Sequence, residues 1–309
     1  MCSYVAALRG SKIDGNLLEC QPGENCYKDQ AYKVLNFLKD KKVDIVHIHR
    51  RNFLTTEAFE FCKENRIPVL YTLHESAKDL LRKFDFSINF LNLDNLFFNA
   101  ISYYQANELS KYFPIKKIIY NAIDTDLYQY SNNQRQNYFL AFGRIAREKG
   151  IHTAIQFAKK CNKQLIIGGN VQDRDYFKFE IEPYIDKVNI KFLGELTDQE
   201  KIPIYQNAAA LLMLEEYDDP YPLVVLEALA CGTPVIAFKK GGIPELVEHK
   251  RTGFLINNIK DGLKFVKELS RISNDDCRKS IEQKFSLNRM AQEYLSLYSD
   301  LVSEMKRGT

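Results

Sequence analysis

Short apolar segments alternate with longer amphipathic ones along the chain, and each apolar segment has the composition of a β-strand. They are rich in Val, Ile, Leu and Phe, and they cover residues 43–48, 69–73, 96–101, 118–120, 138–142, 165–167, 188–193, 209–214, 234–238 and 253–256. Strands that are apolar on both faces are covered on both sides, as in a parallel sheet with helices between its strands. The pattern therefore predicts an α/β protein made of doubly wound units.

The chain is too long for one hydrophobic core. It has 309 residues, and a single core usually stops growing near ~250 to 300. The polar segment 130–137 (YSNNQRQN) resembles a linker more than any other part of the sequence. We therefore predict two domains, residues 1–130 and 131–309. The helical spacing of apolar residues in 286–306 predicts a final helix that packs on either domain or crosses back from the second to the first.

Charge and cysteine content narrow the class of protein. Forty-three basic residues against 40 acidic ones leave a net charge of +3, which argues against nucleic-acid binding through bulk charge. The seven cysteines are scattered without a CxxC pair, which fits a reducing compartment and argues against a disulfide framework or a zinc site. The N-terminus lacks the pattern of a signal peptide, and no segment reaches the ~18 apolar residues of a membrane span. We expect a cytoplasmic protein without a nucleic-acid partner.

Residues with useful chemistry follow several predicted strands, at the edge where parallel sheets bind their ligands. His49 and His74 follow two strands of the first half, and Gly143 and Arg144 follow the first strand of the second half. The same loop (GRIAREKG) carries Lys149, just before a predicted helix. Two cations near a helix N-terminus suit a diphosphate, with Arg as a fork and Lys as a point charge. The alternative is an ordinary solvated basic loop.

One carboxylate stands in an otherwise apolar helix. Residues 223–231 are predicted to be helical, because Pro222 suits the first turn and Gly232 the end, and Glu227 is their only polar member. A buried carboxylate requires a partner, either a structural basic residue or a pair of ligand hydroxyls. We favour the hydroxyls, because Asp219 lies just before the same helix and aims a second carboxylate at the same place. The free N–H groups of the helix N-terminus suit an anion.

Three segments together resemble the retaining glycosyltransferases of family 4: GRIAREKG, the pair Asp219 and Glu227 ending in LEALACGTPVIAF, and GGIPELVEHKRTGFLI. The pair resembles the E-x7-E motif of that family. The resemblance is specific over residues 138–256 and weaker in DIVHIH, YTLHES and YNAID. It implies the GT-B fold, with two Rossmann-like domains facing a cleft. It also implies transfer of a sugar from a nucleotide-diphosphate sugar to an acceptor hydroxyl, with retention of configuration.

The resemblance implies a diphosphate site in the second domain. Arg144 and Lys149, beside Gly143, would hold the diphosphate of the donor. The backbone N–H groups of Leu223 and Val224, at the start of the predicted helix, would add hydrogen bonds to the same group. The leaving diphosphate would be stabilised there, and no protein nucleophile is required.

The remaining donor contacts are also implied by the resemblance. Glu227 would accept hydrogen bonds from the ribose hydroxyls, and the nucleobase would lie against the backbone near Phe192 and Leu193. Asp219 would contact the transferred sugar, and His74 would meet that sugar from the opposite domain. We therefore expect Asp219 and His74 to be the catalytic residues, with no metal or other cofactor essential.

The sequence departs from the family pattern at several places. Asp219 is one methylene shorter than the usual Glu, and Pro222 replaces a usual Gly and has no N–H to donate. Nothing before residue 40 matches the strand, Gly-Gly loop and long helix with which the family opens. The first domain is therefore expected to be shortened on the acceptor side. An alternative is a weakened GT-B protein that binds a nucleotide sugar or acts as a scaffold.

Other readings of the motifs rank lower. His47 and His49 form an HxH pair without an evident third ligand, so we interpret His47 as a core residue rather than a metal ligand. The Asp-x-Asp patterns at 124–126 and 173–175 do not follow strands, and we interpret them as turn and capping residues. A nicotinamide-dependent enzyme ranks last, because no GxGxxG follows any predicted strand.

The segment Ser76–Phe84 (SAKDLLRKF) combines apolar and basic residues at helical spacing. Such a helix usually faces its own core, and the alternative is contact with an anionic membrane or a lipid-linked acceptor. In that alternative the protein would act peripherally at the inner membrane face. The expected partners are a nucleotide-sugar donor and an acceptor that is a sugar, a lipid-linked molecule or a small molecule.

Overall fold

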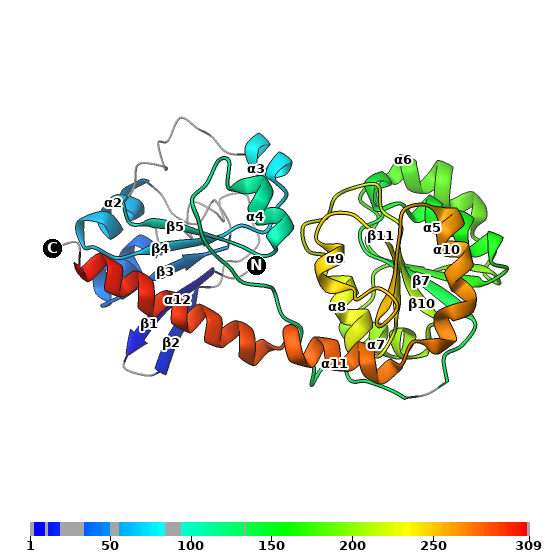
Figure 1. Cartoon of the computed structure of the whole chain (residues 1–309). Coiled ribbons are helices and arrows are strands. Elements are labelled where there is room, and N and C mark those ends of the chain that lie inside the picture. The colour runs from blue at the N-terminus through cyan, green and yellow to red at the C-terminus, as the bar shows by residue number, and fades with distance from the viewer. Residues whose placement is uncertain are drawn as a thin grey trace. The chain divides into compact units, whose positions relative to one another are not determined.

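The computed structural model describes residues 3–9, 12–18, 34–49, 56–83, 94–132 and 134–307, and Figure 1 follows its elements along the chain. The chain forms two compact units, each with a parallel sheet. Unit 1 contains the chain up to Tyr120 and again from Ala291, and unit 2 contains Asn121 to Met290. The division falls before the polar segment 130–137, so residues 121–130 belong to unit 2 rather than to the N-terminal domain expected from the sequence.

The strands of the parallel sheet in unit 1 lie beside one another in chain order. They are β3 (Val46–Ile48), β4 (Val69–Thr72), β5 (Leu96–Ala100) and β6 (Ile115–Ile118). The helices of this unit include α2 (Thr56–Glu64), α3 (Ala77–Lys83) and α4 (Tyr103–Leu109), and residues 34–40 are also helical. Side chains on both faces of β4 and β5 are buried, which is the reason that these strands are mostly apolar, while β6 (IKKI), at the edge of the sheet, is only partly buried.

An antiparallel hairpin precedes this sheet in the chain. β1 (Ser3–Arg9) pairs with β2 (Lys12–Leu18), and Ser3 lies opposite Leu18. We did not predict these strands from the sequence: the apolar residues of β2 are interrupted by Asp, Gly and Asn, and the apolar run of β1 (YVAAL) was not interpreted as a strand. The segment between β2 and residue 34 lies outside the described residues.

The last helix, α12 (Leu287–Arg307), confirms the final helix predicted from apolar spacing, and its C-terminal part belongs to unit 1. The Tyr298 hydroxyl lies 2.5 Å from Nδ1 of His47, and Nε2 of His47 lies 2.6 Å from Oγ1 of Thr72. The Tyr294 hydroxyl lies 3.1 Å from the same Oγ1. This polar network ties α12 to β3 and β4, and the buried position predicted for His47 is confirmed.

Unit 2 contains a sheet of six parallel strands in the order β12-β11-β10-β7-β8-β9. Their bounds are β7 (Tyr138–Phe142), β8 (Gln164–Gly168), β9 (Ile190–Phe192), β10 (Ala210–Met213), β11 (Val235–Phe238) and β12 (Gly253–Ile256). Each of these strands was predicted from an apolar segment, as were β3 to β5 in unit 1. β6 is the exception, because it covers residues 115–118 rather than the predicted 118–120.

The strand order of unit 2 has a switch point between β7 and β10. The chain builds β7, β8 and β9 outward in one direction and then returns to place β10 on the other side of β7. Leu140 of β7 lies beside Leu211 of β10, and Figure 1 shows both strands inside unit 2. Loops that leave two such strands diverge and open a crevice at the carboxyl ends of the strands, where ligands bind in this topology.

Helices and single turns connect the strands of unit 2. The helices are α5 (Ile151–Lys160), α6 (Arg174–Tyr176), α7 (Asp198–Asn207), α8 (Leu223–Ala230), α9 (Ile243–Leu246), α10 (Ile259–Phe265) and α11 (Asn274–Lys284). The 3₁₀ and π segments are η3 (Arg147–Lys149), η4 (Phe177–Ile181), η5 (Glu182–Tyr184) and η6 (Val266–Arg271). α8 confirms the predicted helix: Pro222 is its N-cap, and Gly232 follows it with φ of +86°.

Candidate functional site

The loop that follows β7 packs closely, through backbone atoms, against the loop that follows β8. The N–H of Gly143 donates to the carbonyl of Gly168, at 3.1 Å. A Cβ on Gly169 would lie 1.7 Å from the carbonyl oxygen of Gly143, so a side chain there would separate the two loops. A Cβ on Gly143 would meet nothing within 4 Å. Gly143 therefore borders open space at the carboxyl edge of the sheet.

Lys149 lies at the switch point, between the loops that follow β7 and β10. It ends the turn η3, and a Cβ on the next residue, Gly150, would lie 2.1 Å from the carbonyl oxygen of Leu214. This close approach holds η3 against the end of β10. Nζ of Lys149 lies 2.8 Å from Oε2 of Glu215 and 2.6 Å from Oδ2 of Asp219. We call Lys149, Glu215 and Asp219 the Lys149 cluster.

The backbone around Asp219 fixes its carboxylate toward Lys149. Oδ1 of Asp219 accepts the N–H of Tyr221 at 2.9 Å, which leaves Oδ2 for the lysine. The carbonyl of Asp219 accepts the N–H of Gly242 at 2.8 Å. A Cβ on Gly241, whose φ is +54°, would lie 2.3 Å from that carbonyl oxygen. The two glycines let the loop after β11 pack directly on the Asp219 backbone.

The Lys149 cluster has an unusual charge balance. The pKa of Glu215 is raised to about 7, chiefly by burial and in smaller part by the neighbouring Asp219, while Lys149 opposes both. Burial by itself would lower the pKa of Lys149, but Glu215 and Asp219 outweigh it and raise that pKa. Lys149 therefore stays charged. Oε1 of Glu215 is buried and has no hydrogen-bond partner among the described residues.

Arg144 lies in the same loop after β7 as Lys149, but it is not part of the Lys149 cluster. Its side chain is half exposed, and Nη1 donates to Oε1 of Gln172 at 2.9 Å. A weaker contact of 3.7 Å connects Nη1 to Oε1 of Glu148. Gln172 follows β8, so Arg144 bridges the loops after two neighbouring strands. The guanidinium of Arg144, predicted as a phosphate ligand, is therefore accessible at the carboxyl edge of the sheet.

The N-terminus of α8 adds backbone donors near the Lys149 cluster. The first hydrogen bond of the helix runs from the N–H of Val225 to the carbonyl of Pro222, at 3.1 Å. The N–H groups of Leu223 and Val224 precede it and have no acceptor within the described chain. Leu223 is exposed. The N–H groups of Leu223 and Val224 are the two backbone donors that the family resemblance implied for the diphosphate.

Glu227 has an internal cation as a partner. Nζ of Lys201, from α7, lies 3.0 Å from Oε2 of Glu227, and the hydroxyl of Tyr205 donates to the same oxygen at 2.9 Å. Lys201 also contacts Oδ1 of Asp198 at 2.8 Å. The sequence allowed two kinds of partner for Glu227, a structural basic residue or ligand hydroxyls. The basic residue is Lys201, so ligand hydroxyls are not required to satisfy the charge of Glu227. Both contacts leave Oε1 of Glu227 without a partner from the described residues.

The predicted base site lies at the end of β9. Phe192 is the last residue of this strand, and its ring packs on that of Phe177 with centroids 4.8 Å apart. Leu193 is exposed, and its N–H donates to the carbonyl of Ile167 at 2.9 Å. Gly194 has φ of +74°, and a Cβ there would meet nothing within 4 Å. The strand end therefore offers an open apolar edge.

In unit 1, His74 lies at the end of β4 beside a second histidine. Nε2 of His74 is 2.8 Å from Nδ1 of His49, which follows β3, and both side chains are exposed. The ring of His49 lies 4.1 Å from that of buried His47. The described residues contain no group of three or more His, Cys, Asp and Glu side chains arranged to hold a metal.

The two Asp-x-Asp motifs have the local roles predicted for them. Oδ1 of Asp124 accepts the N–H groups of Asp126 and Leu127, at 2.9 and 3.1 Å. Oδ1 of Asp173 accepts the N–H of Tyr176 at 2.9 Å and caps α6. The turn and capping interpretations are confirmed.

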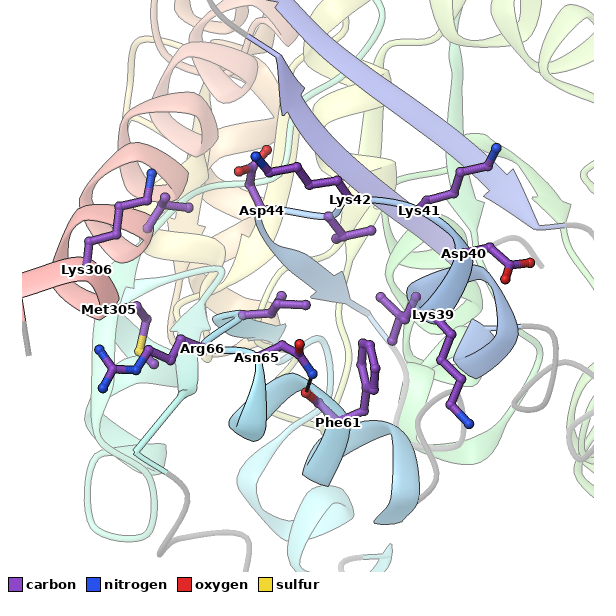
Figure 2. A pocket seen from close by; sticks show the side chains of 14 residues that line it. Lys39, Asp40, Lys41, Lys42, Asp44, Phe61, Asn65, Arg66, Met305 and Lys306 are labelled. Atoms are coloured by element: carbon purple, nitrogen blue, oxygen red, sulfur yellow. Dashed lines mark hydrogen bonds between the residues drawn. The ribbon is translucent and has the colours of Figure 1, made fainter. Parts of the chain in front are cut away.

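A pocket of about 590 Å³ lies at the other end of the unit 1 strands (Figure 2). Its lining comes from the segments that precede β3 and β4, residues 38–44 and 65–67, and from the end of α12. Figure 2 shows basic side chains around it, including Lys39 and Arg66. His49 and His74 follow the same strands, so the pocket is at the edge opposite to the predicted chemistry.

The amphipathic segment 76–84 is described only in part. α3 begins at Ala77, Leu80 is buried, and the Ser76 hydroxyl donates to Oδ2 of Asp79 at 2.8 Å. The side chains beyond Leu80 lie outside the described residues. In the described part of the chain, no helix has the length and apolar content needed to cross a membrane.

Sequence reasoning missed Glu215, Lys201 and Tyr205. Glu215 is the first polar residue after the apolar segment 209–214, so the strand-end rule that selected His74 and Arg144 would also have found it. Lys201 and Tyr205 carried no such signal. They lie on α7, and only the packing of α7 against α8 brings them to Glu227.

Comparison with known proteins gives a family match over both halves of the chain. The family described as "Glycosyl transferases group 1" matches residues 123–288, and that described as "Glycosyltransferase Family 4" matches residues 21–127. One curated relative is N-acetyl-alpha-D-glucosaminyl L-malate synthase from Bacillus anthracis. It is 24% identical over 90% of this chain and 80% of its own length.

Solved structures support the fold. Anabaena HepE, in complex with UDP-glucose, matches with a TM-score of 0.69 and 22% identity over 87% of this chain and 82% of its own. A glycosyltransferase from Rickettsia africae matches with a TM-score of 0.72 and 18% identity over 92% and 84%. The predicted GT-B fold with two Rossmann-like units is therefore confirmed.

Proposed function

We propose, on the premise that the chain belongs to the glycosyl transferases group 1 family, that it moves a sugar from a nucleotide-diphosphate sugar to an acceptor hydroxyl with retention of configuration. The chain is a glycosyltransferase. The observation that carries the finer proposal is Lys149, an ammonium group kept charged at the switch point of the unit 2 sheet.

The donor diphosphate would lie between side-chain cations and the start of α8. Lys149 offers a point charge and Arg144 a half-exposed guanidinium from the same loop, which Gly143 leaves open. The N–H groups of Leu223 and Val224 would complete the site, because the positive end of a helix dipole favours an anion. This set of donors supports a diphosphate rather than a single phosphate.

The nucleoside would extend along the carboxyl edge of the same sheet. Oε1 of Glu227 has no partner from the described chain, so it is the atom that would accept a ribose hydroxyl. The base would pack at the exposed edge formed by Phe192 and Leu193. UDP-glucose is the first donor to test, because HepE was solved in complex with it.

Transfer would proceed by weakening of the bond between the sugar and the diphosphate. The bond from the anomeric carbon to the phosphate oxygen breaks, and a bond to the acceptor oxygen forms on the same face. The acceptor proton passes to the leaving phosphate oxygen. Lys149 and Arg144 would stabilise the charge that develops on this oxygen. Asp219 and His74 would contact the sugar, and no step uses a metal or another cofactor.

The acceptor would be a sugar, a small molecule or a lipid-linked molecule, and the protein would act in the cytoplasm, at a membrane surface in the last case. A second candidate is a binding protein with little transfer activity. It is favoured by one observation, because Lys149 already shares its charge with both Glu215 and Asp219.

Donor binding is tested by thermal shift with UDP-glucose, GDP-glucose and ADP-glucose. A nucleotide sugar present at about 100 times its Kd stabilises the fold by roughly 2.7 kcal/mol, a shift that is easily measured. We expect Lys149→Ala and Arg144→Ala to reduce the shift. The matched control is Lys264→Ala, because Lys264 is an exposed lysine of α10 that contacts only Asp261, at 3.3 Å. If the thermal shift is as large in both variants as in the unchanged protein, Lys149 and Arg144 do not bind the donor.

Transfer is tested with the donor that binds and a panel of acceptors. The anomeric proton of the first product, observed by NMR before it equilibrates, reports whether the configuration is retained. An inverted product would overturn the proposed mechanism, and donor hydrolysis without any product would favour the binding protein. Loss of activity with a chelator would show that a metal is required.

A further inference from the structure

Glu215 is a buried charged group that the described part of the chain satisfies only in part. Its side chain is 1% exposed, yet only one of its two oxygens has a hydrogen bond. Oε2 accepts from Lys149 at 2.8 Å, while Oε1 is buried with no partner. A buried acceptor without a partner is costly, and such groups in folded proteins occur mainly where a ligand, water or proton completes them.

The charges around Glu215 do not cancel. Within the Lys149 cluster, one ammonium group faces the carboxylates of Glu215 and Asp219. The guanidinium of Arg144 acts on Glu215 only from a distance and is bonded to Gln172. Glu216, the next residue, turns away and lies 3.5 Å from Nε2 of His152. When all groups are ionised the cluster therefore carries one excess negative charge, in the place where a diphosphate would bind.

We propose that Glu215 is a positioning residue that holds Lys149 at the donor site and takes up one proton from solvent when a nucleotide-diphosphate sugar binds. This inference rests on the proposed function. The proton adds to the carboxylate of Glu215, so the cluster becomes neutral as the negative diphosphate arrives. Neutral Glu215 also gains an O–H group, which can donate where Oε1 now has no partner.

Donor binding favours the protonated form for two reasons. The diphosphate competes for the ammonium group of Lys149, which is the main interaction that stabilises ionised Glu215. It also places new negative charge beside a buried carboxylate. Both effects raise the pKa of Glu215 above its value in the free protein, which is already about 7 because of burial. The diphosphate of a nucleotide sugar has no group that titrates near this pH, so the proton must go to the protein.

The sign of the pH dependence follows from this shift. Below about pH 6, Glu215 is protonated in the free and bound forms, and affinity does not depend on its titration. Above pH 7, binding requires proton uptake, so affinity falls by up to about tenfold for each pH unit. Glu215→Gln keeps the shape of the side chain and an oxygen for Lys149 but cannot titrate. We expect this variant to bind with the same affinity from pH 6 to pH 9.

The experiment is isothermal titration calorimetry with UDP-glucose, GDP-glucose and ADP-glucose between pH 6 and pH 9. The control is Glu216→Gln, which removes the adjacent carboxylate from an exposed position and should keep the pH profile of the unchanged protein. At pH 8, titrations in two buffers of different ionisation enthalpy count the protons. The unchanged protein should take up close to one proton per donor, and Glu215→Gln none. This count needs no variant if Glu215→Gln does not fold.

The outcomes distinguish failure of the role proposed for Glu215 from failure of the proposed function. Donor binding with a flat pH profile, no proton uptake, or a profile that persists in Glu215→Gln would overturn the role of Glu215 and leave the proposed function standing. If none of the three donors binds at any pH, both proposals fail. A pH profile that is lost in Glu215→Gln and kept in Glu216→Gln would support both.

Discussion

Two lysines of unit 2 each bind a buried glutamate, and the two glutamates differ in how completely the described residues satisfy them. Lys201, on α7, and the hydroxyl of Tyr205 converge on one oxygen of Glu227. Lys149 is shared between Glu215 and Asp219, as Lys201 is between Glu227 and Asp198. However, no second donor among the described residues reaches Glu215, and its Oε1 is buried without a partner there. We call Lys201, Glu227 and Tyr205 the Lys201 cluster.

The difference is in how far the protein itself satisfies each buried carboxylate. In the Lys201 cluster two donors meet a single acceptor, so the charge is satisfied within the protein. In the Lys149 cluster the acceptors exceed the donors, and the imbalance lies at the switch point of the sheet. Perturbed and incompletely satisfied charged groups gather at functional sites. The comparison therefore supports the proposal that the Lys149 cluster binds the diphosphate, while Lys201 and Tyr205 hold Glu227, whose Oε1 would accept the ribose.

The largest expected effect is that of Lys149→Met. Loss of the charge at the leaving diphosphate should lower kcat by about 10² to 10³. The same change leaves Glu215 and Asp219 facing each other without a cation, which should lower the free energy of unfolding by about 3 kcal/mol at pH 8. The loss should be smaller at pH 6, because Glu215 is then protonated. Chemical denaturation at both pH values and initial-rate kinetics measure these effects.

Lys201→Met is the matched comparison. It also removes a cation from a buried glutamate, so a similar loss of stability is expected at pH 8. Its kcat should stay within about threefold of the original, because Lys201 does not contact the diphosphate in the proposed site. Equal losses of kcat in the two variants would contradict the assignment of different roles to the two clusters.

A smaller effect is expected from Glu227→Gln. The carboxylate would accept ribose hydroxyls through Oε1, and hydrogen bonds to a charged group contribute about 1.5 to 3 kcal/mol. We expect the Kd of the nucleotide sugar to rise about 10- to 100-fold, measured by calorimetry.

Asp198→Asn controls for the second partner of Lys201, because it removes that contact without changing Glu227. It should leave the Kd nearly unchanged. If Glu227→Gln lowers stability but not affinity, Glu227 serves only as the partner of Lys201 and Tyr205.

The fold was largely predictable because its signals are local. The strands β7 and β10 are buried at every residue, so each is a continuous apolar run. Pro222 and Gly232 marked the ends of α8 through backbone chemistry alone. The hairpin of β1 and β2 was missed, because the apolar run at residues 4–8 (YVAAL) was not interpreted as a strand and β2 lacks such a run, being interrupted by Asp, Gly and Asn.

The candidate site was predictable only where it follows strand ends. Arg144 and Lys149 were found because they lie in the loop after β7. The pairing of Glu227 with Lys201 was not, because the two residues are 26 positions apart on different helices. Periodicity predicts which face of a helix is buried, but not which side chain lies across from it. For this reason the sequence could offer a basic partner for Glu227 only as an alternative, without naming Lys201.

The smallest expected effect is that of Tyr205→Phe, which removes one of the two donors to Oε2 of Glu227 and leaves Lys201 in place. Burial, with the Glu227 carboxylate adding to it, raises the pKa of Tyr205 well above its ordinary value, so the hydroxyl keeps its proton and donates. We expect a loss of about 1.5 kcal/mol in the free energy of unfolding at pH 7, measured with urea, and an unchanged Kd for the donor. Tyr138→Phe is the control, because the Tyr138 hydroxyl donates at 2.8 Å to the neutral carbonyl of Ile204 and should contribute about 1 kcal/mol. If Tyr205→Phe costs no more than this control, the second donor adds little to the satisfaction of Glu227, and the contrast with Glu215 is weaker than the geometry indicates.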